Sequence, residues 1–303
     1  MIQPASDANT HTATLIAPAG RLTAATVERA RDALPRPGEP RWLDHGTAAD
    51  IPFSLTGDAN QRTVSDSIRT VLGDIDVVVQ PAANRRKNLF LADMDSTLIG
   101  QECIDELAAF VGVKDHVAAI TERAMRGEIA FEPALRERVA LLKGLPVKVV
   151  DEVIDRHITL TPGGRVLVAT MRANGAYTCL VSGGFTLFTD RIAAMIGFDD
   201  ARANTLALEG DRLAGLVDEP IFGRESKRAT LIELRDRLGL NQAETLVTGD
   251  GANDLDMIME AGLGVAYHAK PKVAQAAPAR IEHGDLTALL YLQGYRREEF
   301  VGA

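Results

Sequence analysis

The sequence predicts an α/β fold whose core is a doubly wound parallel sheet, and two patterns in this 303-residue chain support that class. Over residues 161–266, short apolar segments alternate with helical patterns, as they do where helices join parallel strands. Three apolar segments of the chain also run directly into polar clusters, which are Asp93/Asp95, Ser182-Gly183-Gly184 and Asp250/Asn253/Asp254. Because parallel strands present their carboxyl ends at one edge of a sheet, we expect these clusters to meet in one crevice.

Residues 1–85 are expected to form a separate small α+β domain with a linker. The expected elements follow the order βαββαβ of a ferredoxin-like unit, with strands at 14–17, 41–43, 51–55 and 76–79 and helices at 24–34 and 64–72. Thr23 is the expected N-cap of the first helix. The unit resembles an ACT-type regulatory module, but a packing or dimerisation domain without a ligand explains the same pattern, which leaves a homodimer possible. The second domain is expected at 86–303, after the polar stretch 81–88.

A helical bundle is expected between the first two strands of the core. The four apolar residues 89–92 predict a buried strand, and the next strand is expected at 177–181. Between them, apolar residues at helical spacing predict four amphipathic helices, which contain Ile104, Val117, Leu135 and Val149. A bundle at about 101–160 could cover the crevice as a lid that excludes water.

The rest of the second domain continues the alternation of strand and helix. Helices are expected at 165–173, 187–196 and 227–238, followed by one that ends near Ala261. Further strands are expected at 245–247 and 264–266, and segments 205–208 and 213–217 predict an antiparallel hairpin. Ser226 is the expected cap of the helix at 227–238.

Composition argues against several kinds of partner. Because the formal net charge is −9 and no basic run offsets it, we expect no nucleic-acid partner. No apolar run approaches the roughly 20 residues that span a bilayer. Residues 1–13 also lack the pattern of a signal peptide, so we expect a cytoplasmic protein without a membrane partner. Cys103 and Cys179 lie among apolar neighbours and are expected to be buried free thiols.

The residue types in the three clusters suit phosphate chemistry with a divalent cation. Aspartates offer hard oxygen ligands, and several of them in one crevice would repel one another without a cation, which favours Mg²⁺. Ser182 and the amide of Gly183 suit phosphate oxygens at a helix N-terminus, and Lys227 adds a positive charge for the same oxygens.

Each feature also has an ordinary explanation without a ligand. Asp-x-Asp-Ser-Thr is common as an Asx turn that closes a strand, and Gly-Gly and Asp250-Gly251 are common in turns. Lys227 by itself fits a solvated surface lysine. The functional interpretation is favoured by the order in which all these features occur in one chain.

That order resembles the four motifs of the haloacid-dehalogenase superfamily of phosphotransferases. The motifs are Asp93-Met94-Asp95-Ser96-Thr97, Ser182-Gly183-Gly184, Lys227 and Gly249-Asp250-Gly251-Ala252-Asn253-Asp254. Segments 101–106 and 131–139 are in addition similar to the phosphoserine phosphatase family within it, and they are more specific than the general motifs. The resemblance covers about residues 89–290 and implies a HAD-like core with a cap inserted after the first core strand.

The resemblance implies a role in the reaction for each matching residue. Asp93 is the implied nucleophile, and Asp95 is the implied general acid and base. The implied Mg²⁺ ligands are Asp93, the backbone carbonyl of Asp95, and Asp250. Asp254 is implied to orient Lys227 or the surroundings of the metal.

The resemblance also implies contacts with the substrate. The implied substrate-binding residues are Glu102, Arg138, Ser182, Gly183, Lys227 and Asn253. Glu102 and Arg138 match the residues that bind the amino and carboxylate groups of serine. Judged without the resemblance, Glu102 is equally an acidic residue in a helix first turn and Arg138 a helix-surface arginine.

The implied activity is Mg²⁺-dependent hydrolysis of a small molecule, O-phospho-L-serine, to L-serine and phosphate through an aspartyl-phosphate. This is the last step of L-serine biosynthesis. Two alternatives stay open, namely a related phosphatase or phosphotransferase for another small phosphate such as phosphohomoserine, and a non-catalytic regulatory protein that keeps the fold. The Asp93/Asp95 pair argues against the second, because a pure binding protein needs no paired nucleophile and acid.

Overall fold

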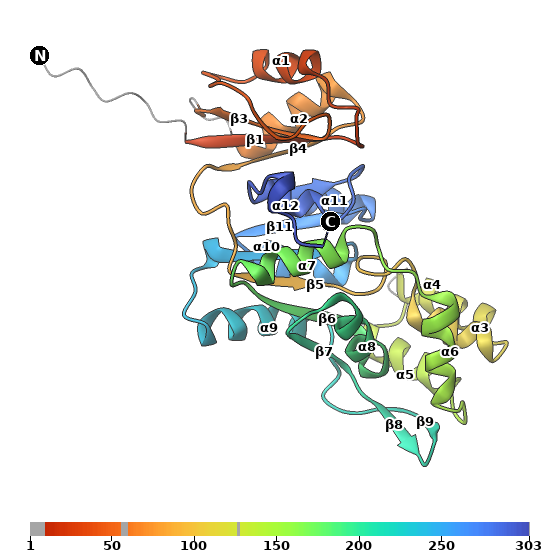
Figure 1. Cartoon of the computed structure of the whole chain (residues 1–303). Helices are drawn as coiled ribbons and strands as arrows, with labels where there is room; N and C mark the ends of the chain where they lie inside the picture. The colour runs from red at the N-terminus through yellow and green to blue at the C-terminus, as the bar shows by residue number, and fades with distance from the viewer. Residues whose placement is uncertain (1–9, 56–59, 126–127, 303) are drawn as a thin grey trace, which may run out of the picture.

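A small N-terminal domain, a core sheet and a helical cap make up the computed structural model, which describes residues 10–55, 60–125 and 128–302 (Figure 1). The first nine residues of the expected N-terminal domain, and its segment 56–59, lie outside the described residues. Within the described ranges, no helix is long and apolar enough to cross a membrane.

The N-terminal domain has the predicted βαββαβ order. Its elements are β1 (His11–Ile16), α1 (Ala24–Asp32), β2 (Arg41–Asp44), β3 (Ala48–Phe53), α2 (Gln61–Leu72) and β4 (Asp76–Pro81). The strands form an antiparallel sheet in the order β2-β3-β1-β4. Thr23 caps α1 as expected, because its hydroxyl oxygen accepts a hydrogen bond from the Thr26 amide (3.1 Å).

The core is a parallel sheet, as predicted, with six strands among the described residues. They are β5 (Leu89–Ala92), β6 (Tyr177–Phe185), β7 (Asp200–Asn204), β10 (Thr245–Gly249), β11 (Leu263–Tyr267) and β12 (Ala279–Ile281). The spatial order is β12-β11-β10-β5-β6-β7, so β6 and β7 lie on one side of β5 and the later strands lie on the other. Such a switch point opens a crevice at the carboxyl ends of the strands.

Helices cover both faces of this sheet (Figure 1). One face carries α7 (Gly164–Ala173), α8 (Thr186–Ile196) and α12 (Ala288–Leu292), and the other carries α9 (Arg224–Arg237), α10 (Leu255–Glu260) and α11 (Pro271–Ala276). In β5, Phe90 and Ala92 belong to the apolar cluster on the first face, and Leu89 and Leu91 belong to the cluster on the second. Burial on both faces explains why β5 is a continuous apolar run in the sequence.

The helical cap lies between β5 and α7, where the sequence predicts it. Its helices are α3 (Cys103–Phe110), α4 (Lys114–Met125), α5 (Phe131–Ala140) and α6 (Lys148–His157). A hairpin formed by β8 (Leu206–Glu209) and β9 (Arg212–Val217) packs against the cap. The Gly144 and Val147 amides in the cap donate hydrogen bonds to the Leu213 and Asp211 carbonyls of this hairpin, both at 2.8 Å. The cap is therefore held both by its own chain connections to β5 and α7 and by the hairpin that follows β7.

Several local predictions are wrong. Ser226 is not the N-cap of α9, because the helix begins at Arg224 after the cap residue Gly223. The hydroxyl oxygen of Ser226 instead accepts a hydrogen bond from the Gly223 amide (3.3 Å), at the third helical position. Strand β6 continues through 182–184 to Phe185 and does not end before them. Strands β7 and β12 and helices α11 and α12 are missing from the prediction, because these segments are short and, in β7, largely polar.

A buried carboxylate in the N-terminal domain holds a loop of the core. Asp76, at the start of β4, accepts hydrogen bonds from the backbone amides of Glu282, His283 and Gly284. These bonds measure 2.7, 3.1 and 2.7 Å, and Asp76 is 1% exposed. Hydrogen bonds from backbone amides to a buried carboxylate are charge-assisted, so this contact fixes how the two domains sit together.

We expect Asp76→Ala to lower the free energy of unfolding by roughly 3 kcal/mol, because it leaves backbone amides without an acceptor at a buried contact. Denaturant unfolding of the full chain measures this change. Asp74→Ala is the matched control, since Asp74 is exposed two residues earlier and should matter little. Equal effects of the two substitutions would show that the loop contact is not important for stability.

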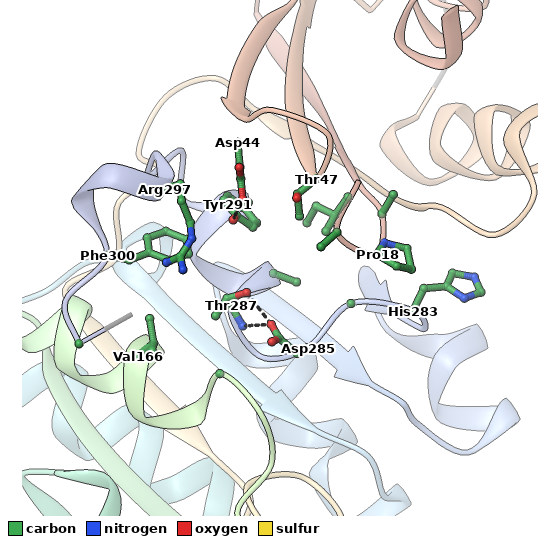
Figure 2. Close-up of a pocket in the computed structure, with 17 residues that line it drawn as sticks. Pro18, Asp44, Thr47, Val166, His283, Asp285, Thr287, Tyr291, Arg297 and Phe300 are labelled. Atoms are coloured by element: carbon green, nitrogen blue, oxygen red, sulfur yellow. Dashed lines mark hydrogen bonds between the residues drawn. The ribbon is translucent and has the colours of Figure 1, made fainter. Parts of the chain in front are cut away.

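A cavity of about 500 Å³ lies between the N-terminal domain and the core (Figure 2). Several of the polar groups at its edge are already paired. Tyr291 donates a hydrogen bond to Asp44 at 2.7 Å, and the amide and hydroxyl of Thr287 donate to Asp285 at 2.8 and 2.5 Å. None of the predicted site residues lines this cavity, so it is distinct from the crevice at the sheet edge.

Candidate active site

The turn after β5 places Asp93 at the crevice. The Asp93 amide donates a hydrogen bond to the carbonyl of Thr248 in the neighbouring strand β10 (3.0 Å). Its carboxylate accepts one from the amide of Met94 (2.7 Å), and Ser96 takes a positive φ of 55° as the chain turns. The hydroxyl of Thr97 then donates to the carboxylate of Asp250 (3.3 Å). The turn after β5 thus brings the first and last predicted motifs together.

Lys227 is fully buried, which excludes the interpretation as a solvated surface lysine. Its ammonium lies 2.7 Å from Oδ1 of Asp93 and 2.8 Å from Oδ1 of Asp254. The second oxygen of Asp254 accepts a hydrogen bond from the Gly251 amide at 3.0 Å. Burial by itself would lower the pKa of Lys227, but Asp254 and Asp93 raise that pKa above its ordinary value, so the ammonium stays charged. Because both of its oxygens are engaged, Asp254 is placed to orient Lys227.

Three buried carboxylates come close enough to hold one cation. Asp93, Asp250 and Asp254 each present an oxygen within 4.8 Å of the others. Burial and then Asp254 raise the pKa of Asp93 well above its ordinary range, although Lys227 opposes this. Burial and then Asp254 also raise the pKa of Asp250 to about 6. Negative charge in this cluster is therefore destabilised, and a hard divalent cation such as Mg²⁺ fits the donor set.

Asp95 lies two residues beyond Asp93 and points toward the cap. Its Oδ1 accepts a hydrogen bond from the amide of Cys103, the first residue of α3, at 3.2 Å. A Cβ added to Gly184 would lie 3.0 Å from its Oδ2, so Asp95 also faces the end of β6. Burial and then the charge of Glu102 raise the pKa of Asp95 to about 7. A carboxyl group with this pKa can carry a proton near neutral pH and also give it up.

Ser182 and Gly183 reach the same crevice at the end of β6. Ser182 is 1% exposed, and its hydroxyl oxygen accepts a hydrogen bond from the Gly184 amide (2.9 Å). The prediction that these residues lie at a helix N-terminus is wrong, because the N-cap of α8 is Phe185. They lie instead in the extended last part of β6.

Asn253 and Asp254 belong to a short 3₁₀ helix, η2 (Ala252–Asp254), directly after β10. Asn253 is partly buried there, and a Cβ at Gly251 would clash with its side-chain oxygen, so a larger residue at 251 would displace the Asn253 side chain. Glycine at 251 therefore leaves room for the Asn253 side chain in the segment that brings the third predicted cluster to the crevice.

Glu102 and Arg138 both lie in the cap. Within the part of the chain that the structure describes, no hydrogen bond or ion pair joins their side chains. Glu102 is the N-cap residue of α3 and accepts a hydrogen bond from the hydroxyl of Ser96 (2.8 Å). Arg138 of α5 is half-buried and donates to neutral oxygens, those of Ala134 (3.2 Å) and Thr121 (3.3 Å). Burial lowers the pKa of Arg138, although Asp105 and Glu102 oppose this.

One aromatic residue at the crevice has no role in the sequence prediction, although it begins the segment 131–139 that resembles the phosphatase family. Phe131, the first residue of α5, is 40% exposed, and its ring lies over two backbone segments. A Cβ added to Gly183 would lie 3.6 Å from Cζ of this ring, and one added to Gly223 would lie 3.3 Å from its Cε1. Its place at the start of segment 131–139, as an aromatic residue opening a largely polar cap helix, is the sequence signal that could have indicated it.

Comparison with known proteins adds independent information. The profile of the haloacid dehalogenase-like hydrolases matches residues 90–259. A phosphoserine phosphatase of Polaromonas is 49% identical over 209 residues, which are 67% of this chain and 89% of that protein. One of Streptomyces coelicolor is 43% identical over 256 residues, which are 84% of this chain but 62% of that longer protein. The crystal structure of a probable phosphoserine phosphatase from Vibrio cholerae matches with a TM-score of 0.76 at 31% identity, covering 97% of this chain and 89% of that one.

Proposed function

The chain belongs to the haloacid dehalogenase-like hydrolase family, and on this basis we propose that it is a phosphoserine phosphatase, which converts O-phospho-L-serine to L-serine and phosphate. The observation that carries the proposal is the buried contact between Lys227 and Asp93 at the crevice. A carboxylate beside a buried ammonium is suited to accept a phosphoryl group whose oxygens need positive charge. The names of the relatives support phosphoserine as the substrate.

Asp93 acts as the nucleophile in this proposal. An oxygen of its carboxylate forms a bond to phosphorus while the bond from phosphorus to the serine oxygen breaks, which leaves an aspartyl-phosphate. Lys227 neutralises charge on the phosphoryl oxygens. In the second step a water oxygen bonds to phosphorus, and the bond to Asp93 breaks to release phosphate.

Asp95 moves the proton in both steps. It gives a proton to the departing serine oxygen and later takes one from the attacking water, so it returns to its starting state. Its place two residues from Asp93, under the cap, suits this position on the leaving-group side.

The carboxylates of Asp93 and Asp250 and the backbone carbonyl of Asp95 would hold Mg²⁺ in this proposal. When bound, the ion supplies positive charge that balances the crowded carboxylates and the phosphoryl group. The close approach of Asp93 and Asp250 supports this assignment.

The rest of the site binds the two ends of the substrate. Ser182, the Gly183 amide and Lys227 hold the phosphate in the proposal, and Asn253 lies near the substrate. Glu102 would face its ammonium group and Arg138 its carboxylate. This choice of charges fits an amino-acid phosphate.

Phosphate release from a small panel of phosphate esters, with and without Mg²⁺, tests the proposal. Phosphoserine should be the preferred substrate, which would place the enzyme at the last step of L-serine biosynthesis. Preference for phosphohomoserine or another small phosphate would favour the related phosphatase. Absence of any release would favour the non-catalytic regulatory protein.

Arg138→Ala should reduce kcat/KM for phosphoserine about 30-fold or more, because it removes a charge-assisted contact with the substrate carboxylate. The rate on p-nitrophenyl phosphate, which has no carboxylate, should change little. Arg136→Ala is the matched control, since Arg136 lies on the same helix and pairs with Glu219 at the surface. An equal loss on both substrates would mean that Arg138 supports the cap and not substrate choice.

The two domains proposed from the sequence, 1–85 and 86–303, have separate roles in this account. We propose that residues 1–85 pack on the core without binding a regulator, so a chain that starts at Arg86 should be less stable but still hydrolyse phosphoserine. Loss of the Asp76 contact explains the lower stability. Titration of both proteins with L-serine tests the role, and inhibition of the full chain alone would show that the domain is regulatory.

A further inference from the structure

Asn204, the last residue of β7, connects two backbone segments of the crevice. Its side chain is 2% exposed. The amide nitrogen donates hydrogen bonds to the carbonyls of Gly183 (2.9 Å) and Phe222 (3.0 Å). The amide oxygen accepts one from the backbone amide of Phe222 (2.6 Å). Three hydrogen bonds from one side chain thus join the end of β6 to the segment before α9.

The chemistry of the partners fixes the orientation of this amide. A backbone N–H can only donate and a carbonyl oxygen can only accept, so the Asn204 oxygen must face the Phe222 amide. A carboxylate at this position would lack the donor that both carbonyls need. Asparagine therefore suits a place where one short side chain must donate and accept at once.

Both connected segments carry groups assigned to the phosphate. Gly183 supplies the amide at the end of β6, next to Ser182. Phe222 directly precedes Gly223, the N-cap of α9, and the backbone amide of Lys227 donates to the Gly223 carbonyl (3.1 Å). Lys227 is thus one helical turn from the segment that Asn204 holds.

The cap lies over the same two segments. The Phe131 ring lies beside both glycines, since a Cβ added to Gly183 or Gly223 would be 3.6 or 3.3 Å from its nearest ring atom. Asn204 binds the backbone of Gly183 and of the residue before Gly223, while the aromatic ring covers both glycines. Asn204 therefore links these two segments, and both lie beside the Phe131 ring of the cap.

We propose that Asn204 is a positioning residue of the phosphate site, which fixes the amide of Gly183 relative to the ammonium of Lys227. It touches no substrate and acts through the two backbone segments. This inference rests on the proposed function, because it takes both groups to hold the same phosphoryl group. Without Asn204, the amide and the ammonium would no longer be held at one spacing, and phosphate would bind less tightly.

Titration calorimetry of the full chain with inorganic phosphate, in the presence of Mg²⁺, tests the proposal. Asn204→Ala should weaken phosphate binding about tenfold, because a tenfold change in affinity corresponds to the net free energy of about one hydrogen bond. Binding of Mg²⁺ should stay within about twofold of wild type, because Asn204 contacts none of the clustered carboxylates. KM for phosphoserine should rise in parallel with the phosphate dissociation constant.

Gln293→Ala provides the matched control. Gln293 is a buried amide that is 1% exposed, and it joins the Lys87 amide to the carbonyl of Leu289, away from the crevice. This substitution should lower the melting temperature by a similar amount but leave phosphate binding unchanged. The comparison of the two variants separates an effect on the position of the phosphate-binding groups from a general loss of stability.

Wild-type phosphate affinity in Asn204→Ala, or an equal loss of affinity in both variants, would overturn the proposal. Asn204→Ser is the second variant should the alanine protein not fold, and failure of both to fold would show that Asn204 serves the fold alone. A wild-type protein that binds phosphate but does not hydrolyse phosphoserine would contradict the proposed function and leave the Asn204 comparison valid. A wild-type protein that binds no phosphate would overturn the inference.

Discussion

Replacement of Asp93 by asparagine is expected to reduce kcat for phosphoserine by at least about a thousandfold, because an amide cannot form the proposed aspartyl-phosphate. The fold should be kept, since asparagine has the same shape and its oxygen can still accept from the Met94 amide and Lys227. Steady-state phosphate release measures the activity, and circular dichroism measures the fold.

Asp256→Asn is the control for this experiment. Asp256 undergoes the same chemical change, but it lies on α10 and pairs with Arg224 at the surface, outside the carboxylate cluster. Its activity should stay near wild type. A folded Asp93→Asn protein that keeps a substantial part of wild-type kcat would contradict the covalent mechanism.

Asp95→Asn is expected to lower kcat by about 10²–10⁴-fold while changing Mg²⁺ affinity little. The substitution removes the group that carries the proton but keeps the backbone carbonyl assigned to the metal. Calorimetric titration with Mg²⁺ and phosphate-release kinetics on the same protein give the two measurements.

The two measurements on Asp95→Asn distinguish two roles for the side chain. A fall in kcat with intact metal binding is the result expected for a general acid and base. Outright loss of Mg²⁺ binding would instead identify the Asp95 carboxylate as a metal ligand. The proposal that Asp95 contacts the metal only through its backbone carbonyl, and uses its carboxyl group for proton transfer, would then be wrong.

Much of the fold could be predicted because its signals are local. The continuous apolar run of β5 and the helical spacing in the cap follow from burial of strands and helix faces, and both predictions are confirmed. Strand β7 could not be predicted, because Asp-Ala-Arg-Ala-Asn has no apolar run and its alternation places only alanine, a weak strand former, at the apolar positions. It becomes a strand by pairing with β6, which is a contact between distant parts of the chain.

The sequence by itself determined which residues can take part in the chemistry. Asp93, Asp95, Lys227 and Asp250 stand in motifs whose order along the chain identified them. The residue types by themselves indicated oxygen ligands for a cation and a positive charge for phosphate, and the resemblance carried by their order implied that Asp93 is the nucleophile. The roles assigned to them remain proposals for the experiments on Asp93 and Asp95.

Only the tertiary structure decided how these groups affect one another. It buries Lys227 between Asp93 and Asp254, and burial raises the pKa of Asp95 to about 7. It also joins Asn204 to Gly183 and Phe222, which lie 21 and 18 positions away in the chain, and no sequence pattern could indicate this. The physical reason is that charge interactions and hydrogen bonds of buried groups depend on distance and solvent exclusion, and both are set by how the strands and helices pack.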